Sequence, residues 1–216
     1  MSRIDAACVL ALTLAGCTSL KALPAGTPSL AISAVPLSPV VEAASDAILL
    51  SFADEESIVQ TRFATATLAL MRAALGHDLA PAIETAEASL AAPLPVDPSE
   101  FEHFVFLGHG WTVGLAFEAA LKFRETSGAW AEAYPGMEYR HGPISVAGPN
   151  TLVWFLGVPT PDLAEAIRVT GATVAGSGAD PMAELVTLQR MAVALAQSRG
   201  LDPDRPQHLT RSVVLP

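Results

Sequence analysis

The stretch Phe104-Val-Phe-Leu-Gly-His-Gly110 decides the fold class of this 216-residue chain. Its first four residues form an apolar run with the length of a buried strand, and the glycines that follow are typical of a tight turn. The residues from 112 to 127 then predict a helix. A strand, a glycine turn and a helix in direct succession form the repeating unit of an α/β protein.

The same alternation continues on both sides of this unit. Further strands are predicted over 30–35, 47–52, 152–156 and 172–175, and further helices over 56–75, 80–91, 161–170 and 181–198. This order predicts an α/β fold in which a parallel sheet is flanked by helices on both faces. The proline-rich stretch 93–98 predicts a linker between two domains, 28–92 and 99–216, and residues 1–27 stay unassigned.

Charge and hydropathy exclude some classes of partner. The formal net charge is −10 and the pI is about 4.8, so we expect no nucleic-acid partner, because such a surface needs a basic patch. The sequence has no apolar run of about 20 residues, the length that spans a membrane, so we expect no membrane partner. A small anionic substrate stays open, because a few N–H groups at one helix start can hold a phosphate.

The N-terminal segment allows two interpretations. Leu14-Ala-Gly-Cys17 resembles the lipobox of an exported lipoprotein. A signal segment needs a positively charged start, whereas Arg3 is offset here by Asp5. We therefore favour a short buried helix at the start of a cytoplasmic protein. The cysteines, Cys8 and Cys17, predict no disulfide framework.

The glycine turn is the first candidate site. Gly108-x-Gly110-x-x-x-Gly114 lies between a predicted strand and a predicted helix, where backbone can approach a ligand. The spacing differs from that of a dinucleotide-binding loop, and the lysine of a phosphate-binding Walker loop is missing. A turn without ligand and a binding loop are about equally compatible with these residues, and we expect His109 to face solvent.

The predicted helix that follows carries the second candidate. Glu118, Lys122 and Glu125 are spaced by four and three residues, which places them on one helical face. From the spacing alone, an exposed row of ion pairs is favoured over a site.

The third candidate is the polar stretch from 131 to 143. Tyr134-Pro-Gly136 predicts a turn, and residues 137–141 predict a short helix that ends at Gly142. A glutamate and a histidine converging on a sugar carbon would suit an aldose–ketose interconversion. Spacing does not decide among Glu132, Glu138, Arg140 and His141.

The residues from Leu107 to Pro143, read together, resemble a known family. LGHG, AFEAALK, AEAYPGMEYRHGP and the C-terminal LDPDRPQHLTRSV are similar to the second domain of tandem sugar isomerase (SIS) proteins. This family includes the isomerase half of glutamine–fructose-6-phosphate aminotransferase and ketose-type sugar isomerases. Residues 28–62 resemble the latter part of the family's first SIS domain, so the resemblance covers about residues 28–214.

The resemblance implies a fold and a set of site residues. The implied fold is a flavodoxin-like, three-layer domain with a five-stranded parallel sheet, usually in a homodimer. Glu125 matches the carboxylate that moves a proton between sugar C1 and C2. His141 matches a histidine of ring opening that, in the aminotransferase, reaches a neighbouring subunit's site. Glu118 and Lys122 match positions close to that centre.

Four more residues are implied to bind substrate. Ser57, Gln60 and Thr61 match a segment near the sugar in the first domain, and Arg211 stands at the position of the family's Schiff-base lysine. Arginine stays protonated and forms no imine under ordinary conditions, but it can hold a phosphate. The implied site needs no cofactor and no metal.

The chain also departs from the family in its first domain. No S-x-S-G-x-T phosphate loop is found, so we expect one complete SIS domain and one partial, N-terminally shortened domain. An exposed sheet edge is expected to favour a dimer or aggregation. The predicted function is a sugar-phosphate isomerase or an amino-sugar-phosphate isomerase/deaminase. The alternative is a non-catalytic sugar-phosphate-binding module or an inactive fragment.

Overall fold

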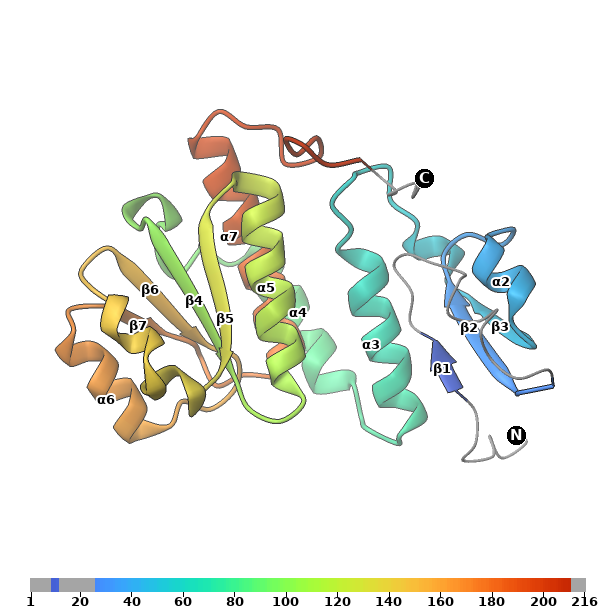
Figure 1. Ribbon diagram of the computed structural model, residues 1–216, viewed down its shortest axis with the longest axis horizontal. Helices are drawn as coiled ribbons and strands as arrows, with labels where there is room; N and C mark the ends of the chain where they lie inside the picture. Colours follow the sequence, from blue (N-terminus) through green and yellow to red (C-terminus); the bar gives the residue numbers. More distant parts are fainter. Residues whose placement is uncertain (1–8, 12–25, 211–216) are drawn as a thin grey trace. The chain divides into compact units, whose positions relative to one another are not determined.

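The computed structural model describes residues 9–11 and 26–210, and these form two compact units. The first unit comprises the described residues up to His77 together with Thr210, and the second runs from Asp78 to Leu209 (Figure 1). The predicted linker 93–98 lies inside the second unit, because the helix before it packs against the last long helix of that unit.

The second unit is an α/β domain with one parallel sheet in the strand order β5-β4-β6-β7. Its described residues form four strands, one fewer than the five implied by the family resemblance. The strands are β4 (His103–Gly108), β5 (Trp130–Pro135), β6 (Thr151–Phe155) and β7 (Thr173–Ala175). The helices are α4 (Ala80–Ala91), α5 (Thr112–Ser127), α6 (Pro161–Val169) and α7 (Pro181–Ser198). Three short 3-10 turns connect them, namely η2 (Pro98–Glu100), η3 (Glu138–His141) and η4 (Pro143–Val146).

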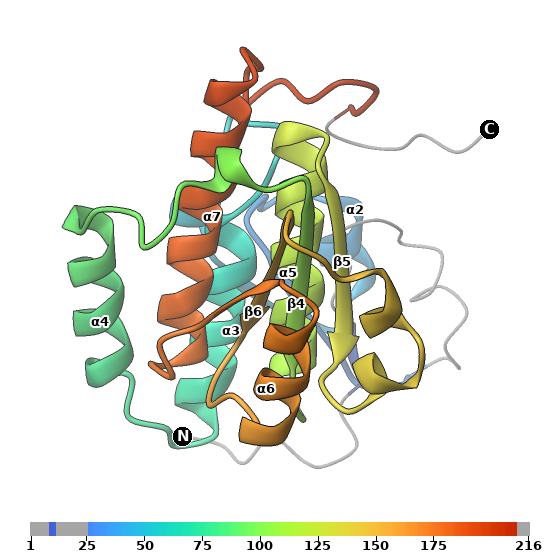
Figure 2. The ribbon, with the colours of Figure 1, turned by 90° about the vertical axis from the view of Figure 1, so that its left-hand side faces the viewer.

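The central strand β4 is buried along its whole length, because helices cover both faces of the sheet (Figures 1 and 2). Phe104 and Phe106 point to one face, where their ring centroids lie 4.8 and 5.0 Å from that of Phe123 on α5. The alternating residues Val105 and Leu107 pack on the other face with α6. This alternation follows from the two-residue period of a strand.

The turn predicted at 134–136 is wrong in its first two residues, which belong to the edge strand β5. Tyr134 pairs with Leu107 and Pro135 pairs with Gly108, so the turn begins only at Gly136. β5 is mostly half-buried or exposed, and it therefore lacks the apolar run that marks a buried strand. Proline is tolerated here because this strand lies at an edge of the sheet.

The first unit has a parallel sheet with strand order β1-β2-β3. The strands are β1 (Val9–Ala11), β2 (Ser29–Ser33) and β3 (Asp46–Leu49). The helices are α2 (Pro39–Ala43) and α3 (Arg62–Ala74), and η1 (Ser51–Ala53) is a 3-10 turn. Residues 9–11 are a strand, which corrects the expected N-terminal helix at these positions. The core is formed by Ile32, Leu50 and Ala53, against which Phe63 and Leu70 of α3 pack.

Helix α3 begins at Arg62, six residues later than the sequence predicts. The carboxylate of Glu55 explains the late start. It accepts hydrogen bonds from the backbone N of Thr61 (2.8 Å), the hydroxyl of Thr61 (2.9 Å) and the backbone N of Arg62 (2.7 Å). Free N–H groups at the helix start are thus satisfied by a side chain outside the helix. Among the described residues, no helix has the length and apolar character needed to cross a membrane.

Candidate active site on helix α5

Helix α5 follows β4 directly, and the turn between them is built for close packing. A Cβ atom at Gly108 would lie 2.5 Å from the carbonyl carbon and oxygen of Thr112, so only glycine fits there. The N–H groups of residues 112–114 donate to carbonyl groups of the preceding turn. This favours the turn without ligand over the binding loop, because the N–H groups are already engaged. His109 is exposed, as expected, with its Nε2 3.2 Å from the hydroxyl of Thr160.

The three charged residues of α5 meet around a buried ammonium group. Nζ of Lys122 lies 2.7 Å from Oε2 of Glu125 and 3.5 Å from Oε1 of Glu118. The Lys122 side chain is only 5% exposed, and those of Glu118 and Glu125 are 17% and 22% exposed. The interpretation as an exposed row of ion pairs is therefore wrong. We call this buried group of Glu118, Lys122 and Glu125 the α5 triad.

The two carboxyl groups of the α5 triad differ in their surroundings. Burial raises the pKa of Glu118, the charge of Lys122 lowers it, and the charge of Glu125 raises it further. Oε1 of Glu118 is buried and has no hydrogen-bond partner, whereas Glu125 accepts the short bond from the ammonium. Two carboxyl groups in unequal surroundings are suited to the separate tasks of proton donor and proton acceptor.

The position of α5 is fixed by contacts of its last turn. The helix ends at Gly128 with φ of 62°, a left-handed conformation that favours glycine. The Arg124 side chain donates to the carbonyl of Ala131 at 2.7 Å, which fixes the helix end to β5. The hydroxyl of Thr126 lies 3.3 Å from the carbonyl of Ala192, where α7 covers the helix.

His141 lies on the other side of the sheet from the α5 triad. It is exposed and belongs to η3, whose Tyr139 packs into the core beside Val105 and α6. Helix α5 covers the opposite face, as Figure 1 shows. Within one chain the sheet separates His141 from Glu125, and the structure does not bring the two together.

The remaining candidates lie elsewhere in the chain. Ser57, Gln60 and Thr61 share the loop before α3 in the first unit, where Thr61 bonds to Glu55 and the hydroxyl of Ser57 accepts from the backbone N of Val59. Arg211 lies outside the described residues. Among the described residues, no three His, Cys, Asp or Glu side chains are gathered as metal ligands.

Sequence reasoning missed one polar pair of the second unit. Nε2 of His103 lies 2.8 Å from Oε2 of Glu132, and the His103 ring stacks on Trp130 with 4.3 Å between ring centroids. The missed strand β5 carries both partners of the histidine, so a correct strand assignment would have placed them beside it.

Two buried groups were also missed. Burial, followed by the charges of Glu132 and Tyr134, raises the pKa of Tyr139 to about 12. Glu184 is 3% exposed and accepts hydrogen bonds from Trp154 and Ser177. Apart from the position of Glu184 in the first turn of α7, the sequence pattern gives no signal for either residue.

No protein-family model matches the chain. A glutamine–fructose-6-phosphate aminotransferase (isomerizing) of Nostoc sp. is 30% identical over 167 residues, which are 64% of this chain and 26% of that protein. The chain thus spans about a quarter of the length of the curated relatives it matches.

Solved structures share the fold over most of the chain. A glucosamine-6-phosphate deaminase from Thermotoga maritima superposes with a TM-score of 0.75 and 30% identity, over 87% of this chain and 67% of that one. A tagatose-6-phosphate ketose/aldose isomerase from Escherichia coli superposes with a TM-score of 0.69 over 84% of this chain and 65% of that one. Its identity is 19%, so this likeness concerns the fold alone.

Proposed function

Because this chain belongs to the sugar isomerase (SIS) domain family, we propose that it binds a sugar phosphate and catalyses its aldose–ketose isomerisation or deamination. The α5 triad is the observation that carries the proposal. An ammonium group buried between two carboxyl groups is costly to keep, and such groups are concentrated at functional sites.

The proposed chemistry moves one proton between neighbouring carbons of the open-chain sugar. Glu125 removes the proton from C2 of the aldose and returns it to C1, while the hydroxyl proton on O2 passes to O1. Negative charge develops on the sugar oxygens in between, and the ammonium of Lys122 lies 2.7 Å from the base and can stabilise that charge. Glu118, whose pKa is raised by burial, is suited to donate a proton to an oxygen.

The proposed site includes a second copy of the chain. His141 and Glu125 lie on opposite sides of one sheet, so a histidine that assists ring opening has to come from a partner subunit. This supports a homodimer as the active form. Ser57, Gln60, Thr61 and Arg211 are proposed to bind the sugar and its phosphate.

We propose the domain organisation that the sequence suggests, with residues 28–92 as the remnant of the first SIS domain and a connecting helix, 93–98 as the linker, and 99–216 as the second SIS domain. The connecting helix is α4, which packs against α7 of the second compact unit. A cytoplasmic location is part of this proposal.

Proton exchange with solvent tests the catalytic role directly. In D2O, we expect the purified chain to place deuterium on C1 of fructose 6-phosphate, which proton NMR measures. A deaminase would also release ammonia from glucosamine 6-phosphate. Glu125→Gln is expected to lower the rate by about 10²–10⁴-fold. Glu165→Gln, on the exposed face of α6 with a side chain 70% exposed, is the matched control and should retain the rate.

A non-catalytic sugar-phosphate-binding module is the second candidate. The arginine at 211, in place of an imine-forming lysine, favours it. Thermal-shift measurements with both sugar phosphates separate the two functions, because a ligand raises the melting temperature by mass action even without turnover. A melting shift without deuterium exchange would support the binding module and contradict the isomerase.

A further inference from the structure

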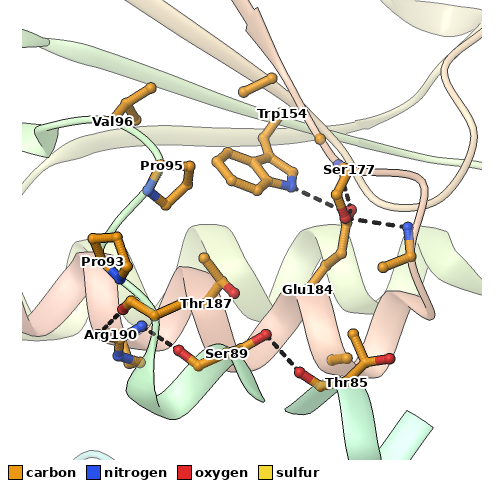
Figure 3. Close-up of a pocket in the computed structure, with 15 residues that line it drawn as sticks. Thr85, Ser89, Pro93, Pro95, Val96, Trp154, Ser177, Glu184, Thr187 and Arg190 are labelled. Atoms are coloured by element: carbon orange, nitrogen blue, oxygen red, sulfur yellow. Dashed lines mark hydrogen bonds between the residues drawn. The ribbon is translucent and has the colours of Figure 1, made fainter. Parts of the chain in front are cut away.

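The second unit contains a cavity that includes no residue of the α5 triad. It has a volume of about 420 Å³ and is bordered by α4, the stretch 93–96, the carboxyl ends of β6 and β7, and the first half of α7 (Figure 3). This volume lies in the range of small-molecule pockets, about 300–1,000 Å³. Ligands of open α/β sheets bind outside the carboxyl ends of the strands, which is where this cavity lies.

Glu184 is the acidic group that lines one end of the cavity. Its Oε1 accepts hydrogen bonds from the backbone N (2.6 Å) and hydroxyl (2.5 Å) of Ser177, and its Oε2 accepts one from the indole N–H of Trp154 (3.0 Å). A carboxylate has about four acceptor positions, so one on Oε2 is left. Figure 3 shows the Trp154 indole and the Glu184 carboxylate side by side at this end.

No counter-charge accompanies this carboxylate in the described part of the chain. Glu184 is 3% exposed, and all three of its donors are neutral. Buried carboxylates are ordinarily paired with a cation, because neutral donors replace lost hydration but not the opposite charge. Arg190 also lines this cavity, but it lies six residues later on α7, about 9 Å farther along the helix axis than Glu184. Its guanidinium donates to the carbonyl groups of Ser89 and Ala92.

The rest of the cavity wall is mainly apolar. Pro93, Pro95 and Val96 line the end away from Glu184, together with alanine side chains. An aromatic face near a carboxylate favours an organic cation, since the ring attracts positive charge and the walls take an apolar body.

We propose that this cavity binds a small primary amine with an apolar body, whose ammonium group donates to Glu184 beside Trp154. The site is separate from the sugar-phosphate site, because the cavity includes no residue of the α5 triad. The proposal does not depend on the proposed enzyme activity.

Titration of the full chain with phenethylamine tests this proposal. 2-Phenylethanol is the neutral control ligand of similar shape, and phenylacetate is the anionic control ligand. We expect the amine to bind with a dissociation constant of roughly 1 mM, at least tenfold tighter than either control ligand. It should also shift the indole N–H resonance of Trp154 in a ¹⁵N spectrum, assigned with Trp154→Phe.

Three variants separate a charge-specific site from a purely structural role of Glu184. Glu184→Gln should weaken amine binding at least tenfold, whereas Glu165→Gln, which removes an equal charge from the exposed face of α6, should not. If Glu184→Gln does not fold, Ala179→Leu tests the site instead. Its larger side chain should fill part of the cavity and weaken amine binding without changing the carboxylate. Equal binding of amine and alcohol, or amine binding retained in Ala179→Leu, would overturn the proposal.

Discussion

Replacing Lys122 by methionine tests the buried character of the α5 triad. Methionine keeps most of the volume and removes the charge, so two carboxyl groups with side chains 17% and 22% exposed lose their shared cation. Breaking a buried ion pair by removing one partner costs about 3–5 kcal/mol. Partial exposure of the carboxyl groups places the expected loss at the lower end, about 3 kcal/mol, whereas an exposed row of pairs would lose only a few tenths.

Unfolding in urea, followed by tryptophan fluorescence and far-UV circular dichroism, measures this loss. About 3 kcal/mol corresponds to a melting temperature lower by roughly 10 °C for a unit of this size. The loss should depend on pH. Burial already raises the pKa of Glu118 in the folded state. Protonated Glu118 therefore stabilises the fold at pH values below the ordinary pKa of glutamate, and this contribution is lost as the pH rises through the raised, folded-state pKa. Without Lys122 the deficit should therefore be small near pH 4 and full at pH 7.

An exposed ion pair of α6 provides the matched control. Nη1 of Arg168 lies 3.5 Å from Oε2 of Glu165, with side chains 56% and 70% exposed. Arg168→Met should lower the free energy of unfolding by less than about 0.5 kcal/mol. If Lys122→Met costs no more than Arg168→Met, and shows no pH dependence, the argument from burial fails.

Three further predictions concern other positions of the fold. Tyr139→Phe should leave the free energy of unfolding at pH 7 unchanged or raise it by about 1 kcal/mol, because the buried hydroxyl has no hydrogen-bond partner. The raised pKa of Tyr139 implies that the wild type loses stability between pH 10 and about 12, and urea unfolding should show no such loss in the variant. Gly108→Ala should cost about 1–3 kcal/mol because its Cβ meets the backbone of Thr112, whereas Gly114→Ala, with nothing within 4 Å, should gain about 0.5–1 kcal/mol; equal effects of the two in thermal melts would contradict the packing argument. Glu55→Ala should cost about 1–2 kcal/mol and lower the helical circular dichroism signal, since α3 loses the side chain that satisfies its first N–H groups.

The sequence predicts those elements whose ends carry local signals. α5 and α7 begin and end at the predicted residues, because Gly128 ends the first in a left-handed conformation and Asp180 caps the second by accepting from the backbone N of Met182. α3 begins later than predicted, since the carboxylate of Glu55 lies outside the helix. β5 was missed because an edge strand has no continuous apolar run.

The candidate site is less predictable than the fold, because burial is decided by distant parts of the chain. Spacing places Glu118, Lys122 and Glu125 on one face of a helix, but the same spacing occurs on exposed helices. Here α7 covers α5, as the contact between Thr126 and Ala192 shows, and these residues lie far apart in sequence. Periodicity within α5 carries no information about that contact.

The α5 triad can be tested for function and stability together, because the two respond differently to its charges. Replacing buried ion pairs by well-packed hydrophobic side chains of similar volume is often neutral or stabilising. A chain with Lys122→Met, Glu118→Met and Glu125→Met should therefore recover most of the roughly 3 kcal/mol that Lys122→Met alone loses. The same chain should place no deuterium on fructose 6-phosphate, since it has lost the proposed base. A structural role for the triad requires that the neutral triple variant be less stable than the wild type, so its unfolding free energy separates an arrangement kept for the fold from one kept for chemistry.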